Sequence, residues 1–136
     1  MIIREIEERD ANNRQNLIYQ LKNWKLNIDE VIEIIRNYKN DNYKAFVVKI
    51  DDIVVGLVAI SITKSFVRTA KYCRIMALVV DENYRNMQIG RKLMLYAEAC
   101  SKYNNCILIN LTSNKKRKAC DSIEVRFSKI INQHNI

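Results

Sequence analysis

The chain has 136 residues, 49% of them hydrophobic, and a formal net charge of +8. This length predicts a single domain over residues 1–136, because a chain of this size buries about two thirds of its unfolded surface. It has no apolar run of about 18 residues and no signal-peptide pattern, which predicts a cytoplasmic protein without a membrane partner. Its four cysteines lack the paired spacing of a zinc site, so we expect no metal and reduced thiols.

The first half of the chain predicts one strand and two helices. Residues 2–6 indicate a short strand, after which Asp10 is placed to cap a helix. The apolar face of that helix has helical spacing and consists of Leu17, Ile18, Leu21 and Trp24. Asn27 and Glu30 have the spacing of a capping box and open a second helix. We expect its inward residues to be Val31, Ile32, Ile34, Ile35 and Tyr38.

A β-hairpin is predicted next. Residues 43–50 and 53–62 are β-branched and apolar, and only Asp51 and Asp52 separate them. Gly56 lies within the second strand, where glycine indicates a bulge or close backbone packing.

The second half predicts a strand, a helix and two further strands. Strict alternation along residues 72–80 predicts one face with Tyr72, Arg74, Met76 and Leu78, and the opposite face with Cys73, Ile75, Ala77 and Val79. A helix is expected from about Gln88, burying Ile89, Leu93, Tyr96, Ala97 and Cys100. Residues 106–112 follow this crossover helix and should therefore run parallel to the strand before it. Residues 123–131 alternate as a final strand.

The connection from 79 to 94 carries the strongest chemical signal. An apolar strand runs there through a polar turn directly into an amphipathic helix, and the first turn of a helix has amide donors without intrahelical partners. These donors and the helix dipole attract phosphate. Gly90 permits close approach to the backbone, and Arg85, Arg91 and Lys92 add positive charge. The alternative is an ordinary strand-to-helix connection.

The order β-α-α-β-β-β-α-β-β, together with this segment, resembles the GNAT superfamily of acetyl-coenzyme A dependent N-acetyltransferases over residues 1 to about 118. The family's cofactor loop is written Q/R-x-x-G-x-G/A. Here it reads Arg85-Asn86-Met87-Gln88-Ile89-Gly90, with Gln88 in place of the middle glycine. Segments 2–5, 54–56, 78–81 and 111–113 are also similar.

The resemblance implies an α/β (α+β) fold with a mixed, mostly antiparallel sheet flanked by helices and a central, splayed pair of parallel strands. It implies acetyl-CoA as cofactor, with the amides from Gln88 to Arg91 holding the pyrophosphate. The implied cofactor-binding residues are Leu78, Val79, Val80, Arg85, Asn86, Met87, Gln88, Ile89, Gly90, Arg91 and Asn114. Asn114 is equally consistent with a simple turn residue.

Two departures from the family pattern affect catalysis. Residues 119–122 lead almost directly into the final strand, so the family's fourth helix, with a tyrosine that protonates the thiolate, is not evident. The position of a glutamate that deprotonates the amine is matched by Met76 and Ala77, which cannot take a proton. Each such group contributes about 10² to 10⁴-fold, so its loss predicts impaired activity and leaves the catalytic residues unknown. Substitutes considered are Tyr72, Tyr84, Cys120 and Asp121, each more simply a packing or surface residue.

Three functions follow in order of preference. The first is acetyl transfer from acetyl-CoA to a primary amine on a small-molecule or peptide acceptor. The second is a catalytically weak or inactive CoA-binding module. The third, ranked last because no recognition motif appears, is a basic nucleic-acid or protein binder that uses the run 115–118.

Other reactive side chains point to no further chemistry. Ser113 lacks a histidine that could activate it, and the single histidine, His134, lies at the C-terminus. A homodimer is a further expectation, because a missing helix would leave a strand edge or an apolar groove for a second copy to cover.

Overall fold

The computed structural model describes residues 1–23, 25–111 and 127–130. Its strands form one six-stranded sheet in the order β1-β2-β3-β4-β5-β6, in which only β4 and β5 are parallel neighbours. The strands are β1 (Ile2–Glu5), β2 (Tyr43–Ile50), β3 (Ile53–Lys64), β4 (Lys71–Val80), β5 (Cys106–Leu111) and β6 (Phe127–Ile130). The helices are α1 (Ala11–Lys22), α2 (Ile28–Asn37) and α3 (Ile89–Tyr103), with short 3-10 helices η1 (Glu8–Asp10) and η2 (Glu82–Met87). The predicted element order and fold class are confirmed.

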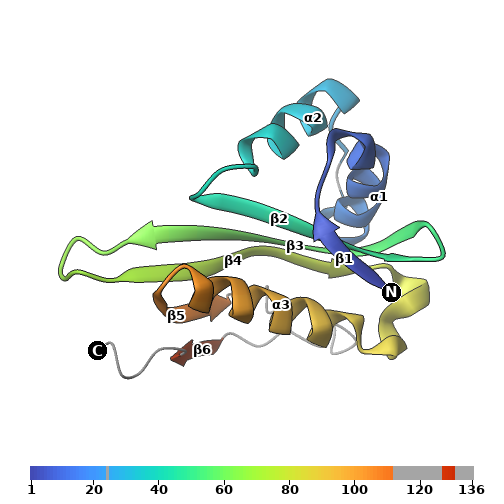
Figure 1. Cartoon of the computed structure of the whole chain (residues 1–136). Helices are drawn as coiled ribbons and strands as arrows, with labels where there is room; N and C mark the ends of the chain where they lie inside the picture. Colours follow the sequence, from blue (N-terminus) through green and yellow to red (C-terminus); the bar gives the residue numbers. More distant parts are fainter. Residues whose placement is uncertain (24, 112–126, 131–136) are drawn as a thin grey trace.

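The sheet is covered on both faces. Helices α1 and α2 lie on one face and α3 lies on the other (Figure 1). Two separate groups of buried side chains fill these layers. The group under α3 includes Val58, Ile60, Leu93 and Ile109, and the group under α1 and α2 includes Leu17, Val31, Ile35, Val47 and Leu57. Burial of apolar side chains on both faces accounts for the long β-branched runs of β2 and β3.

Helix α2 begins as predicted, and α1 does not. The side chain of Asn27 accepts from the amide of Glu30 at 2.9 Å, and Glu30 accepts from the amide of Asn27 at 3.5 Å. Asp10 precedes α1, but its side chain does not cap that helix. Both its carboxylate oxygens accept instead from Arg4, at 2.8 and 2.9 Å, and one also accepts from the amide of Glu7 at 2.8 Å. The bidentate, charge-assisted pair with Arg4 thus uses both oxygens that a cap of α1 would need.

The hairpin confirms two predictions. Asp51 and Asp52 have φ values of 51° and 65°, the left-handed geometry that a two-residue hairpin turn requires. The pairing of β2 with β3 shifts register between Val48 and Lys49, which leaves one extra residue beside Gly56. A Cβ on Gly56 would lie 3.2 Å from Leu93 Cδ1. Both the bulge and the close packing expected of this glycine are therefore present.

The predicted faces of β4 are wrong over half of the strand. Ala59 pairs with Ala77 but the next residue of β3, Ile60, pairs with Ile75, so Met76 is an extra residue in β4. A bulge of this kind reverses the side-chain alternation. Before the bulge, Cys73 and Ile75 face α3; after it, Leu78 and Val80 face α3, and Ala77 and Val79 face α1 and α2.

Helix α3 buries most of the side chains that the sequence predicted. In α3, Ile89, Leu93 and Ala97 are buried and Cys100 is half-buried, as predicted. Tyr96 is 37% exposed and not buried, because its ring lies edge-on against Phe46 at the rim, with centroids 4.8 Å apart. Trp24 lies outside the described residues. Among those described, no helix has the length and apolar character needed to cross a bilayer.

Candidate functional site

Strands β4 and β5 pair in parallel along the first half of β4. Their parallel pairing runs from Lys71 with Cys106 to Ile75 with Leu111, and within the described residues it continues no further. β4 itself extends to Val80 and stays paired with β3 throughout. On the β5 side, the second half of β4 therefore presents backbone groups that no described strand pairs. An extended molecule with amide groups could pair there as an added strand does.

The loop after β4 is held at both of its sides. The amide of Asp81 donates to the carbonyl of Val55 at 2.8 Å, and the Asp81 carboxylate accepts from the amide of Asn83 at 2.9 Å, which starts η2. Gln20 of α1 donates to the other oxygen of that carboxylate at 3.3 Å. The amide of Glu82 donates to Gln20 Oε1 at 3.0 Å. The loop is thus fixed before α3 begins.

Gln88 turns the chain into α3 with a left-handed backbone, at φ 59° and ψ 26°. No side chain caps the helix, and the amide of Lys92 donates to the carbonyl of Gln88 at 3.2 Å. The amides of Ile89, Gly90 and Arg91 precede this first helical hydrogen bond. In a 15-residue helix, these donors and the dipole form an anion-binding end.

The remaining cofactor candidates lie along the same strand-loop-helix segment. Leu78 and Val80 are half-buried beside α3. The Val79 side chain lies on the opposite face of the sheet, so Val79 could contact a cofactor on the α3 side only through its backbone. Arg85 Nε donates to the carbonyl of Val80 at 3.3 Å. Met87, Gln88 and Arg91 are exposed, and Asn86 contributes its backbone to η2. Asn114 lies outside the described residues.

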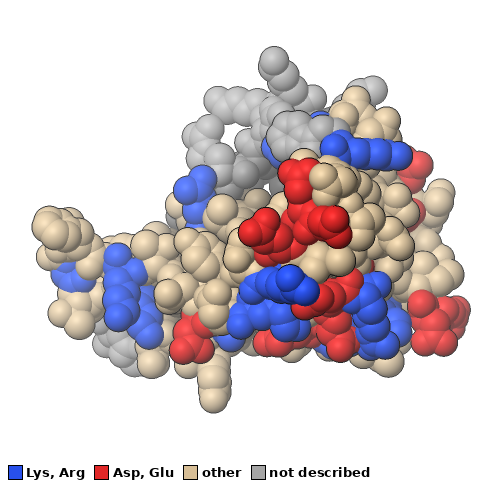
Figure 2. All heavy atoms as spheres, turned by 90° about the horizontal axis from the view of Figure 1, so that it is seen from above, with Lys and Arg blue, Asp and Glu red and all other residues tan. Residues whose placement is uncertain are grey.

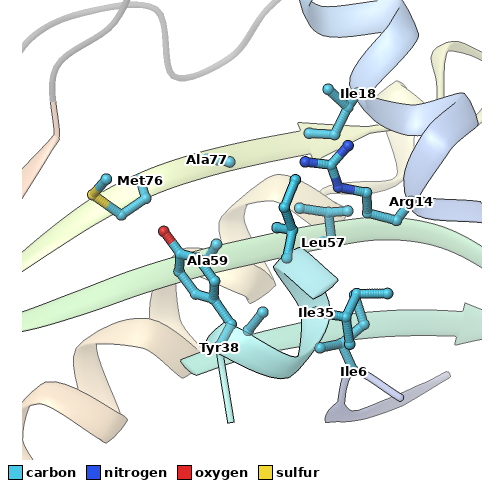
Figure 3. A pocket seen from close by; sticks show the side chains of 11 residues that line it. Ile6, Arg14, Ile18, Ile35, Tyr38, Leu57, Ala59, Met76 and Ala77 are labelled. Atoms are coloured by element: carbon cyan, nitrogen blue, oxygen red, sulfur yellow. The ribbon is translucent and has the colours of Figure 1, made fainter. Parts of the chain in front are cut away.

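A pocket on the other face of the sheet was not anticipated. It has a volume of about 200 Å³ between α1, α2 and the strands (Figure 3). Its lining is apolar except for Arg14 and Tyr38, and consists of Ile6, Arg14, Ile18, Ile34, Ile35, Tyr38, Ala45, Leu57, Ala59, Met76 and Ala77. The bulge at Met76 therefore lies at the wall of this pocket. The only signal in the sequence was the pair of small residues, Ala59 and Ala77, in otherwise bulky strands.

The two polar side chains of the pocket differ in their partners. Nη1 of Arg14 is buried and has no hydrogen-bond partner among the described residues. Burial lowers the pKa of Arg14, but arginine remains protonated. Burial also raises the pKa of Tyr38, so its phenol is neutral, and its ring lies edge-on to Tyr43 with centroids 5.3 Å apart.

The other residues considered for catalysis are not brought to this pocket. Tyr84 packs against the core under α3, and Tyr72 lies on β4 before the bulge. Burial raises the pKa of Cys73 to about 11 and that of Cys106 to about 12, so both thiols stay protonated. The remaining candidates lie outside the described residues, and these are Cys120, Asp121, Ser113, His134 and the basic run 115–118. No group of three or more His, Cys, Asp or Glu in the described part could hold a metal ion.

Charge on the face that Figure 2 shows is mixed. Lys and Arg lie among Asp and Glu over the described part of this face, without a continuous basic surface. Nucleic acid binding requires clustered positive charge. This face therefore gives no support to the hypothesis that the protein binds nucleic acid.

Comparison with known proteins shows a family from the sequence and a shared fold from solved structures. The sequence model of the acetyltransferase (GNAT) family matches residues 5–121. A Trypanosoma brucei acetyltransferase structure is 24% identical, with a TM-score of 0.74 over 85% of this chain and 84% of that one. A GNAT family acetyltransferase of Staphylococcus aureus is 23% identical, with a TM-score of 0.73 over 85% and 87%. Glucosamine-6-phosphate N-acetyltransferase of Arabidopsis thaliana is 24% identical, with a TM-score of 0.68 over 87% and 85%. No curated protein sequence matches the chain.

Proposed function

Since the chain belongs to the GNAT family of acetyltransferases, we propose that it transfers acetyl from acetyl-CoA to a primary amine. One observation carries this proposal. The second half of β4, which no described strand pairs on the β5 side, and the start of α3 lie at one side of the Met76 bulge, and a pocket of about 200 Å³ lies at the other. Donor and acceptor can thus approach one backbone segment from opposite faces of the sheet.

The residues present fit acetyl-CoA chemically. The amides of Ile89, Gly90 and Arg91 would bind the diphosphate, and the positive charge of Arg91 adds attraction. The backbone of residues 78–80 would hydrogen-bond the amide groups of the pantetheine arm. When bound, acetyl-CoA supplies the acetyl group as a reactive thioester.

The chain contributes alignment more than proton transfer. Backbone amides of β4 that no described strand pairs on the β5 side could stabilise negative charge that develops on the thioester oxygen. The attacking amine loses one proton and the departing thiolate gains one. Water that reaches the pocket can accept the first proton and supply the second. Among the described lining residues, Tyr38 is the one neutral hydroxyl that can donate a hydrogen bond there.

The second candidate, a CoA-binding module with little catalysis, is favoured by one observation. The bulge presents Met76 and Ala77, and neither can act as a base. Losing a general base costs about 10² to 10⁴-fold, which slows an aligned reaction without abolishing it.

Calorimetric titration separates these possibilities. We expect acetyl-CoA to bind, and pantetheine, which lacks the diphosphate, to bind at least about 10-fold more weakly. Arg91→Ala should weaken acetyl-CoA binding, whereas Arg68→Ala, on the exposed β3–β4 loop, should not. No binding at high micromolar acetyl-CoA would overturn the proposal. Binding without thiol release on a broad amine panel would support the inactive module.

A further inference from the structure

The pocket beneath α1 and α2 contains a cation that acetyl transfer as such does not require. We propose that the Arg14 guanidinium binds a carboxylate of the acceptor, so that the substrates are small amines that carry a carboxylate. This inference rests on the proposed function, and it names the class of acceptor.

Arg14 extends from α1 into the pocket. Figure 3 shows its guanidinium pointing toward the strands beside Ala77, with Leu57 and Ile18 nearby. Tyr38 directly follows α2, and its hydroxyl points toward the strands on the side of Met76 (Figure 3). Both polar groups therefore face the region where two alanines leave space.

The guanidinium has no acidic partner in the part of the chain that the structure describes. Nη1 is buried without a hydrogen bond, and none of the ion pairs among the described residues includes Arg14. The buried carboxylate closest in sequence, Asp10, is already held by Arg4 at 2.8 Å. An unsatisfied charged donor in an apolar site is costly, so such a group is retained where a ligand completes it.

The ligand that completes it should be an anion with a planar fork of oxygens. Arginine presents paired N–H donors that match a carboxylate in bidentate geometry. One cation balances one negative charge, which suits a carboxylate better than a phosphate monoester. The volume of about 200 Å³ lies below the roughly 300–1,000 Å³ of sites for drug-sized ligands, so the acceptor is small.

The position of Arg14 relative to the Met76 bulge would set the orientation of the acceptor. Met76 and Ala77 line the pocket, and they also begin the half of β4 that no described residue of β5 pairs. A carboxylate held by Arg14 would leave the amine of a short acceptor free to lie toward this segment. Arg14 is then a specificity-determining residue, and it takes no part in proton transfer.

The test compares matched amines in a thiol-release assay and by calorimetry. Glycine is paired with glycinamide, 5-aminopentanoate with pentylamine, and phosphoethanolamine with ethanolamine. N-acetylglycine, which needs no turnover, is titrated to measure binding directly. The variants are Arg14→Gln, Arg14→Lys and, as a control that removes one distant charge, Arg68→Gln.

We expect carboxylate-bearing amines to be preferred about 10-fold or more over their neutral partners, and Arg14→Gln to abolish that preference. Arg14→Lys should retain part of it, and Arg68→Gln should leave it unchanged. Arg14→Gln should also melt no lower than the parent protein, because it removes a charged group whose buried Nη1 has no partner among the described residues.

Three outcomes would overturn the inference. They are equal use of charged and neutral amines, a loss on Arg14→Gln that is the same for both members of a pair, and a preference for phosphoethanolamine over the carboxylates. If no amine reacts, absence of N-acetylglycine binding to a protein that binds acetyl-CoA overturns it. Failure of acetyl-CoA itself to bind would instead overturn the proposed function.

Discussion

Gln20 and Asp81, 61 residues apart in sequence, are joined by a hydrogen bond of 3.3 Å from the Gln20 amide to the Asp81 carboxylate. Gln20 also accepts from the amide of Glu82 at 3.0 Å. It lies on α1, the helix that also carries Arg14. The helix that lines the pocket therefore also fixes the start of the loop proposed to bind the cofactor.

Replacing Gln20 with alanine should loosen that loop. Two hydrogen bonds are lost at a half-buried site, so we expect about 1–2 kcal/mol less stability and weaker acetyl-CoA binding. Chemical denaturation and calorimetry measure the two effects. Asn16→Ala, at an exposed position of the same helix, is the control. Unchanged acetyl-CoA affinity in a destabilised Gln20→Ala variant would show that the loop does not depend on this contact.

The left-handed backbone of Gln88 predicts a substitution pattern. Its φ of 59° is strained for a β-branched residue and free of strain for glycine. Gln88→Val should therefore lower the free energy of unfolding by about 1–2 kcal/mol, whereas Gln88→Gly should not lower it by more than a few tenths. Thermal melts of the two variants measure this difference. If both variants melt alike, the chain does not enter α3 through this geometry.

Close packing at Gly56 makes that position intolerant of larger side chains. A Cβ there would lie 3.2 Å from Leu93 Cδ1, 3.3 Å from Ile89 Cγ2 and 3.3 Å from the carbonyl oxygen of Val79. Gly56→Val should destabilise the protein by about 1–3 kcal/mol, because the backbone carbonyl cannot move aside. Denaturant midpoints test this, with Ile53→Val at a half-exposed site of the same strand as the control. A stable Gly56→Val variant would contradict the packing of α3 on β3.

The Arg4–Asp10 pair predicts an acid-sensitive contribution to stability. Burial raises the pKa of Asp10, but hydrogen bonds from Arg4 and from the amide of Glu7 outweigh this and hold it below the ordinary 3.8. A depressed carboxyl pKa adds stability above the unfolded pKa, and that stability is lost as pH falls through the folded pKa. Below pH 4, the parent should therefore lose stability more steeply than Asp10→Asn. Parallel acid-limb slopes in denaturation at several pH values would contradict this.

Short sequence patterns predicted the structure correctly where neighbouring residues alone determine it. The Asn27 and Glu30 box, the Asp51-Asp52 turn and the strand-loop-helix at 79–94 depend on neighbouring residues. Two errors arose where a residue of another element competes. Asp10 forms a pair with Arg4 and not a cap, and the Met76 bulge reverses the faces of β4 because β3 pairs around it.

The sequence by itself determined the order of the elements, the helix starts and turns set by short-range hydrogen bonds, and the family to which the chain belongs. The tertiary structure alone decided that β4 bulges at Met76, that Gln20 holds the loop after β4, and that Arg14 and Tyr38 line one pocket. The physical reason is range. A cap or turn is fixed within a few residues, whereas a pocket depends on which side chains of separate elements are left without partners once the layers have packed.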